Sequence, residues 1–170
     1  MTRIEPQAFT AGNVFIEGMG YVGALKDFEQ PKFEHESIEV NSSIGKRECV
    51  LPTLKPLSAK VSFQALDKVF FSLLKKGSFQ KITIKGNVSS SSDSGVPKET
   101  AVHTTLEGHI KSAELPKFEM GKELEMSMEL SVVKYAQTVG GNEVIVYDVF
   151  TSTLKYAGED QFASIRTNIN

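Results

Sequence analysis

The sequence contains a single cysteine, no excess of basic residues and no long apolar run, and each of these absences excludes a class of protein. Cys49 alone cannot close a disulfide within the chain or build a thiolate metal cage, so a disulfide-stabilised extracellular scaffold is excluded. The 19 basic and 21 acidic side chains leave a formal net charge of −2. Because general nucleic-acid binders carry a basic excess to neutralise phosphates, tight DNA binding is disfavoured.

Membrane insertion is not expected either. No apolar run approaches the roughly 18 residues of a membrane-spanning helix. The stretch from Met1 to Gln7 lacks the hydrophobic block of a signal peptide, so we expect no membrane anchor and a protein that stays in the cytoplasm where it is made. With 170 residues, 40% of them hydrophobic and 24% charged, the composition predicts one folded domain over residues 1–170 and excludes disorder and a coiled coil.

Most of the chain alternates between apolar and polar residues, which predicts β-strands. The clearest case is Lys122 to Val132, where one face carries Glu123, Glu125 and Glu129 and the other face is apolar. Shorter alternating stretches predict further strands at 60–65, 81–85, 101–113 and 143–150. The last of these is apolar on both faces, so it needs cover from the core or from another subunit.

Two segments have helical spacing instead. Leu66 to Lys76 is predicted to form an amphipathic helix that ends at Gly77, and a short C-terminal helix is expected to open near Asp160. Ser89 to Gly95 has the composition of a flexible hairpin loop. Val40 to Pro56 is expected to be an extended loop, because it alternates poorly and contains two prolines.

These elements predict a mainly β fold, a barrel or sandwich of antiparallel strands with one flanking α-helix and a short C-terminal helix. Such a fold has many strand edges, which must be covered or paired with another chain.

No catalytic, cofactor or metal site is predicted. Gly18 to Gly23 formally matches GxGxxG, but no helix follows to receive a pyrophosphate, so a hairpin turn is the better interpretation. His103 and His109 would lie about 20 Å apart on one strand, too far for one metal. Cys49 has no evident histidine partner that would activate it as a nucleophile.

Several short motifs follow one another along the chain in a characteristic order and spacing. They are Asn13-Val-Phe-Ile-Glu-Gly18 with Tyr21-Val-Gly23, then Gln30-Pro-Lys-Phe33, then Leu106-Glu-Gly-His-Ile-Lys111, Lys117-Phe118 and Gly121-Lys-Glu-Leu-Glu125, and finally Gly158-Glu-Asp-Gln-Phe-Ala-Ser-Ile-Arg166. Together they resemble the major tail tube proteins of contractile-tailed bacteriophages and of the related phage-tail-like bacteriocins. Two departures are Ser43-Ile-Gly45, where that family often has Gly-Gly-Met, and Phe118 in place of a common tryptophan.

The resemblance implies a tail-tube fold whose copies close into a hexameric ring. Rings then stack into a hollow tube, which the contracting sheath drives through the target envelope as a conduit for the genome, or for ions in a bacteriocin. The implied partners are further copies of the chain, the tail sheath protein, a tape-measure protein, and baseplate and tail terminator proteins. DNA would pass through without specific binding, and the protein would reside in the virion tail after assembly in the bacterial cytoplasm.

Two groups of residues are given roles, one by the resemblance and the other by a hypothesis about the lumen of such a tube. The long connection would reach the adjacent ring through Ser42, Ile44, Lys46, Arg47 and Glu48, although a solvated loop is the plain alternative. The acidic face with Glu123, Glu125 and Glu129 is the candidate lumen surface, because a wall without excess lysine lets a polyanion slide. Two other functions stay open: a secreted hexameric tube protein of a type VI-like injection system, and a monomeric binding module or small enzyme.

Overall fold

The computed structural model describes residues 4–17, 25–75, 79–91 and 95–170, which form eleven strands and two helices. The strands are β1 (Gln7–Ile16), β2 (Leu25–Glu29), β3 (His35–Ser42), β4 (Gly45–Leu54), β5 (Leu57–Phe63), β6 (Phe79–Ser91), β7 (Pro97–Glu114), β8 (Met126–Val139), β9 (Asn142–Asp148), β10 (Thr153–Tyr156) and β11 (Glu159–Asp160). The helices are α1 (Lys68–Leu73) and α2 (Ala163–Ile169). The mainly β fold expected from the sequence is confirmed.

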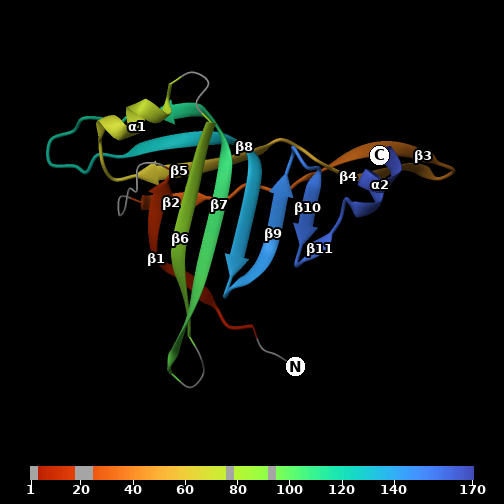
Figure 1. Cartoon of the computed structure of the whole chain (residues 1–170), viewed down its shortest axis with the longest axis horizontal. Coiled ribbons are helices and arrows are strands. Elements are labelled where there is room, and N and C mark those ends of the chain that lie inside the picture. The colour runs from red at the N-terminus through yellow and green to blue at the C-terminus, as the bar shows by residue number, and fades with distance from the viewer. Residues whose placement is uncertain (1–3, 18–24, 76–78, 92–94) are drawn as a thin grey trace.

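A branched antiparallel sheet of nine strands forms the body (Figure 1). Its main path runs β1-β6-β7-β8-β9-β10-β11, and β5 joins it on β8 with β2 beyond. The branch arises because β8 is long: its first half, up to Val132, pairs with β5, whereas its second half, from Lys134, pairs with β9. The buried core is made by the inward faces of β1, β5, β6, β7 and β8, together with Phe70 and Leu73 of α1.

Helix α1 closes one side of this core and is shorter than the predicted Leu66 to Lys76. Asp67 has an extended backbone, and its carboxylate accepts a hydrogen bond of 2.9 Å from the Val69 amide, which starts the helix at Lys68. Phe70 stacks on Phe63 of β5 with the ring centroids 4.5 Å apart. Lys76 and Gly77 lie outside the described residues, whereas the predicted C-terminal helix is confirmed as α2.

The expected loop from Val40 to Pro56 is instead a β-hairpin of β3 and β4, which extends from one end of the body (Figure 1). An antiparallel ladder satisfies the backbone groups that an extended loop would leave to water. The two prolines are compatible with it, because Pro52 lies where the register shifts between the pairs Ser37–Val50 and His35–Leu54, and Pro56 follows the end of β4.

Two smaller expectations also need correction. Ser89, Ser90 and Ser91 continue β6 rather than forming a loop, since they pair with Glu99, Lys98 and Pro97 of β7. Strand β8 begins at Met126, so Glu123 and Glu125 precede the strand on which they were expected. The glycines of Gly18 to Gly23, for which a hairpin turn was expected, lie outside the described residues; on either side of them, β1 pairs with β6 and β2 pairs with β5.

Candidate assembly interface

The hairpin of β3 and β4, called the arm below, has one apolar and one polar face. Residues directly opposite each other in an antiparallel pair share a face. Ile38 lies opposite Cys49, and Val40 lies opposite Arg47, which gives a mostly apolar face. The other face carries the pairs Glu39–Glu48, Asn41–Lys46 and Ser37–Val50. A two-stranded hairpin is marginally stable alone, so an apolar face of this kind favours packing against another surface.

The polar side chains of the arm pair with one another, and several of its apolar side chains are exposed as well. Lys46 contacts the Glu39 carboxylate at 3.1 Å, Ser37 donates to Glu48, and the Ser42 hydroxyl donates to the Gly45 carbonyl at 2.6 Å. The side chain of Ile44 at the tip is 99% exposed and that of Ile38, on the apolar face, is 50% exposed. Apolar groups held out in this way mark an interaction surface.

The base of the arm is fixed to the body by an aromatic cluster. The ring of Phe33 meets the rings of Tyr135, Tyr147 and Tyr156 edge-on, with centroids 5.5, 6.2 and 6.3 Å apart. His35 donates from Nδ1 to the Pro52 carbonyl at 3.1 Å, which leaves its Nε2 to accept from the Tyr156 hydroxyl at 3.5 Å. The arm therefore leaves the body in a defined direction.

Charge pairing strengthens the same base. The Glu34 carboxylate lies 2.6 Å from the Lys55 ammonium and 3.0 Å from that of Lys32, and hydrogen bonds from these lysines lower the pKa of Glu34 to about 2. The Lys55 amide also donates to the Glu34 carbonyl at 2.8 Å. These contacts join the chain segments that enter and leave the arm.

The structure brings the five predicted inter-ring residues together on the outer half of the arm. Ser42 and Ile44 lie at its tip, and Lys46, Arg47 and Glu48 follow on β4. In the described part of the chain the Arg47 guanidinium has no ion pair, in contrast to Lys46. The sequence prediction missed Ile38, Cys49 and Val50, although the alternation of Ile38 and Val40 with polar residues was a signal for them.

The predicted acidic face is instead a patch of mixed charge. Glu125 pairs with Lys26, Glu129 lies 3.3 Å from Lys111, and Glu123 accepts a bond of 3.3 Å from the Gln64 amide. We define the mixed-charge patch by its five lysines and five glutamates, which are Lys26, Lys60, Lys111, Lys117, Lys122, Glu114, Glu119, Glu123, Glu125 and Glu129. Its formal charge is zero, so the three glutamates do not act as an unopposed acidic surface.

Comparison with known proteins identifies the family. The sequence profile described as phage tail tube protein FII matches residues 6–169. The chain belongs to this tail tube family. No curated protein sequence matches the chain.

Solved structures share the tail tube fold at low sequence identity. A sheath-tube complex of the PVC extracellular contractile injection system, in the extended state, is 11% identical with a TM-score of 0.52, covering 75% of this chain and 87% of that chain. A sheath/tube terminator structure of the same system is 12% identical with a TM-score of 0.51, covering 75% and 92%. The tail-tube fold expected from the sequence motifs is thus confirmed.

Within the described ranges, no group of three or more His, Cys, Asp or Glu side chains could hold a metal ion. Among the same residues, no helix has both the length and the apolar character needed to span a bilayer.

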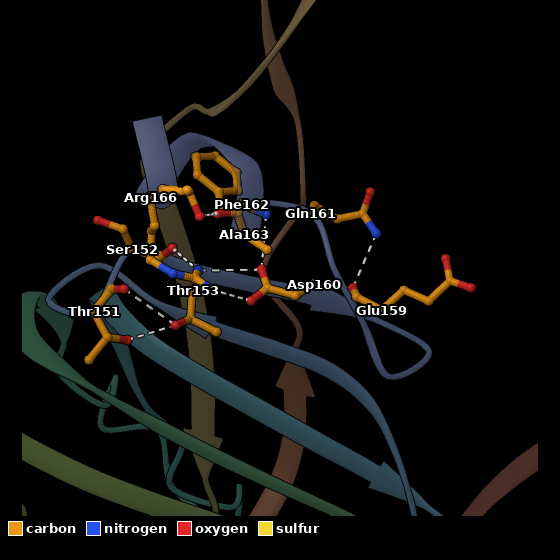
Figure 2. A network of polar contacts seen from close by, with 10 residues as sticks. Thr151, Ser152, Thr153, Glu159, Asp160, Gln161, Phe162, Ala163 and Arg166 are labelled. Atoms are coloured by element: carbon orange, nitrogen blue, oxygen red, sulfur yellow. Dashed lines mark hydrogen bonds and ion pairs between the residues drawn. The ribbon is translucent and has the colours of Figure 1, made fainter. Parts of the chain in front are cut away.

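The C-terminal motif of this tail tube protein forms a polar network that holds α2 against the turn between β9 and β10 (Figure 2). Asp160 forms an ion pair with Arg166 and accepts a hydrogen bond of 2.9 Å from the Phe162 amide. Arg166 also donates to the Ser152 carbonyl at 2.8 Å. The motif Gly158 to Arg166, which carried part of the resemblance, is therefore a clip that sets the position of the last helix.

Replacing Asp160 with Asn should loosen α2 while leaving the body intact. The change removes the charge that pairs with Arg166, and α2 buries none of its own residues in the core. We expect faster amide hydrogen exchange at residues 163–169, with little change in the melting temperature. Glu159→Gln is the control, since Glu159 is exposed and has no ion pair among the described residues. Unchanged exchange in Asp160→Asn would show that Arg166 does not hold the helix.

The same clip predicts a pH dependence. Hydrogen bonds from Arg166 and from the Phe162 amide lower the pKa of Asp160 below its ordinary value of 3.8. A carboxylate whose pKa is lowered in the folded state stabilises that state at pH values above its ordinary pKa. This stabilisation is lost as the pH falls through the lowered pKa. Because the intrinsic exchange rate of an amide itself falls as the solution is acidified, the quantity to follow is the protection of the α2 amides relative to an unfolded chain. This protection should stay high at neutral pH and fall only as the pH drops below about 3.8.

Proposed function

We propose that this tail tube protein is the ring-forming subunit of the inner tube of a contractile tail. Six copies close a ring, and the arm of each subunit contacts the neighbouring ring. The family match over residues 6–169 carries the proposal, and the exposed apolar side chains of Ile38 and Ile44 on the arm support it. The two solved structures described above come from a contractile injection system, one from a sheath-tube complex and one from a sheath/tube terminator.

The role of such a subunit is mechanical, and no catalysis is part of it. The sheath contracts around the tube and drives it through the target envelope, so the tube depends on the summed strength of its subunit interfaces. The proposed partners are further copies of the chain, the sheath, a tape-measure protein, and the baseplate and terminator proteins. The assembled protein resides in the tail, where DNA passes through the lumen without specific binding.

Electron microscopy of the purified protein over a concentration series, with light scattering for mass, tests this function. Six-fold hollow rings or stacked tubes are the expected result. A protein that stays monomeric at the highest soluble concentration, and also when baseplate components are added as nuclei, would contradict the proposal. A closed ring of any other symmetry would contradict the hexamer.

We further propose that the mixed-charge patch, with Glu123, Glu125 and Glu129, faces the lumen. Its equal numbers of lysines and glutamates fit a conduit, because a surface with net positive charge would hold phosphates by releasing their counterions. The ion pairs Lys26–Glu125 and Lys111–Glu129 keep these lysines partly neutralised. A cross-section map of the tube that placed the patch on the sheath side would overturn this assignment.

Neutralising the three glutamates should make the tube retain DNA. The triple variant Glu123→Gln, Glu125→Gln and Glu129→Gln leaves the patch with five lysines and two glutamates, a formal charge of +3. We expect assembled tubes to retain a fluorescent single-stranded oligonucleotide at low salt and to release it as salt rises. In the control variant Lys60, Lys111 and Lys122 are replaced by Gln, which gives the patch a negative charge. This variant should retain no oligonucleotide. Equal retention by both variants would contradict the prediction.

A further inference from the structure

Two exposed apolar surfaces lie in separate parts of the molecule: the connection between β7 and β8 lies at one end of the long axis, and the arm extends from the other (Figure 1). One is the connection between β7 and β8, where Leu115, Phe118 and Met120 are uncovered; we call these three residues the knob. The side chain of Phe118 is 77% exposed and that of Met120 is 100% exposed. Neither the arm nor the core covers the knob, so it is available to another molecule.

The other surface is a hollow of about 200 Å³ at the base of the arm. Leu54 of β4 lies on one side of it, Tyr147 and Val149 at the end of β9 on another, and Leu154 and Phe162 complete its apolar lining. Phe150, beside this lining, is 69% exposed. The lining also includes the polar residues Thr53, Asp148, Ser152 and Thr153, but its larger part is apolar, and an apolar side chain can insert into a site of this type.

The knob cannot fill the hollow of its own chain, because the body of the sheet lies between them (Figure 1). A second copy of the chain can fill it. Repeated contacts between two different surfaces of one subunit are heterologous, and they generate a ring when the rotation closes. A closed ring gives every knob a hollow and leaves neither surface exposed.

The exposed apolar area fits this occupant. Phe118 lies on one partner and Phe150 on the other, so covering each removes roughly 150–250 Å² from its own partner, about a fifth to a third of the roughly 800 Å² that each partner buries in a standard interface. Charge does not oppose the contact, because Lys117 beside the knob lies 4.0 Å from Glu119, and Asp148 in the hollow lies 3.9 Å from Lys134.

We propose that the knob of one subunit inserts into the hollow of the next subunit of the same ring. The proposal rests on the proposed function and adds to it the two lateral surfaces, whereas the arm makes the contact between rings. Phe118 and Met120 are the anchors, and Leu54, Val149, Leu154 and Phe162 receive them.

Cysteine cross-linking of assembled protein tests the pairing directly. In a Cys49→Ser background, Met120→Cys is combined with Val149→Cys, and a short bismaleimide is added. Denaturing electrophoresis should then show a ladder of linked chains that ends at the hexamer. The control combines Met120→Cys with Lys98→Cys, at the exposed start of β7, and should give no ladder. A ladder only in the control pair would overturn the proposal.

Introducing negative charge into the knob by mutation gives a second test of the contact. Phe118→Asp with Met120→Asp should retain the circular dichroism spectrum of the folded subunit, because neither side chain lies in the core. We expect the concentration at which half of the subunits are assembled into rings to rise at least roughly 30-fold, as for the loss of one interface hot spot. Ile4→Asp, a similar change at a 91% exposed site, is the control and should assemble normally.

The two experiments separate the two proposals. If the unmodified protein forms no rings even with baseplate nuclei, the proposed function fails. If it forms rings, while the Met120–Val149 pair does not link and the knob variant assembles at the normal concentration, only the knob-and-hollow contact is wrong.

Discussion

Replacing residues 39–48 of the arm with Asn-Gly should give a folded subunit that no longer stacks into tubes. Ile38 and Cys49 lie directly opposite each other, in the same phase of the ladder as Ser42 and Gly45, which flank the native two-residue turn, so a two-residue turn can join them without changing the register below. The variant loses Ile44, Arg47 and Val40 of the apolar face, which are among the groups proposed to contact the next ring. Its base, with Phe33 and His35, stays intact.

The subunit should survive this truncation because the removed residues contribute nothing to the core. The buried apolar cluster draws on β1, β5, α1, β6, β7 and β8 and includes no fully buried residue of β3 or β4. The melting temperature should therefore stay within a few degrees of the unmodified protein, at about 2–4 °C per kcal/mol for a chain of this size. Electron microscopy should show single rings in place of tubes.

Mixing truncated subunits with unmodified subunits gives the control for this prediction. A truncated subunit that still enters rings should shorten the tubes of the unmodified protein in proportion to its share of the mixture. A full-length arm with Ile38→Thr and Val40→Thr keeps the length but removes the apolar face, and tells whether that face or the reach of the arm is required. Normal tubes from the truncated protein alone would show that stacking does not use the arm.

The regular parts of this fold were predictable from local pattern. The alternation from Met126 to Val132 identified the central strand β8, and the apolar spacing around Phe70 identified α1. Both predictions rest on neighbours in sequence, which is the range over which periodicity carries information. The C-terminal helix followed in the same way from Phe162, Ile165 and Ile169.

The local sequence pattern did not predict the arm, because its sequence features do not resemble those of an ordinary hairpin. Its turn, Ser43-Ile44, lacks the Asn-Gly or Asp-Gly signature of a two-residue hairpin, and Pro52 interrupts the alternation of β4. Both faces are largely exposed in the isolated subunit, so the apolar pattern is weak. A strand whose cover comes from another molecule has little reason to show the pattern of one buried in its own core.

The charge of the candidate lumen surface could not be predicted from the sequence for a different reason. Glu125 and Glu129 were visible as acidic residues, but their partners Lys26 and Lys111 come from β2 and β7. Which lysine reaches which glutamate depends on the order and register of strands that are distant in sequence. The predicted acidic face became a neutral patch once those strands were in place.

A single methyl group at Gly108 should destabilise the whole subunit. Gly108 lies in β7 at the point where the sheet branches: it pairs with Val132, whereas Glu107 pairs with Lys134, so Val133 is the extra residue of a bulge. The Val133 carbonyl accepts a hydrogen bond of 3.1 Å from the Val149 amide, which joins the β9 side of the branch. The bulge thus connects the two halves of the body.

Gly108→Ala would place a Cβ atom 2.0 Å from the Ser131 carbonyl oxygen and 2.9 Å from its carbon. Both are backbone atoms of the neighbouring strand, so no side chain can rotate away, and the bulge itself must shift. We expect a loss of about 3 kcal/mol in the free energy of unfolding, the upper part of the range for overpacked sites. At about 2–4 °C per kcal/mol, this corresponds to a melting temperature lower by roughly 6–12 °C.

Gly12→Ala is the matched control, and urea unfolding of both variants is the measurement. At Gly12 the nearest atoms, 2.5 Å from the added Cβ, belong to the ring of Phe9, an exposed side chain that can swing aside. Its cost should stay below about 1 kcal/mol, partly because alanine restricts the unfolded chain more than glycine does. Equal stability of the two variants would mean that the Gly108 bulge tolerates displacement and that the branch of the sheet is held by other contacts.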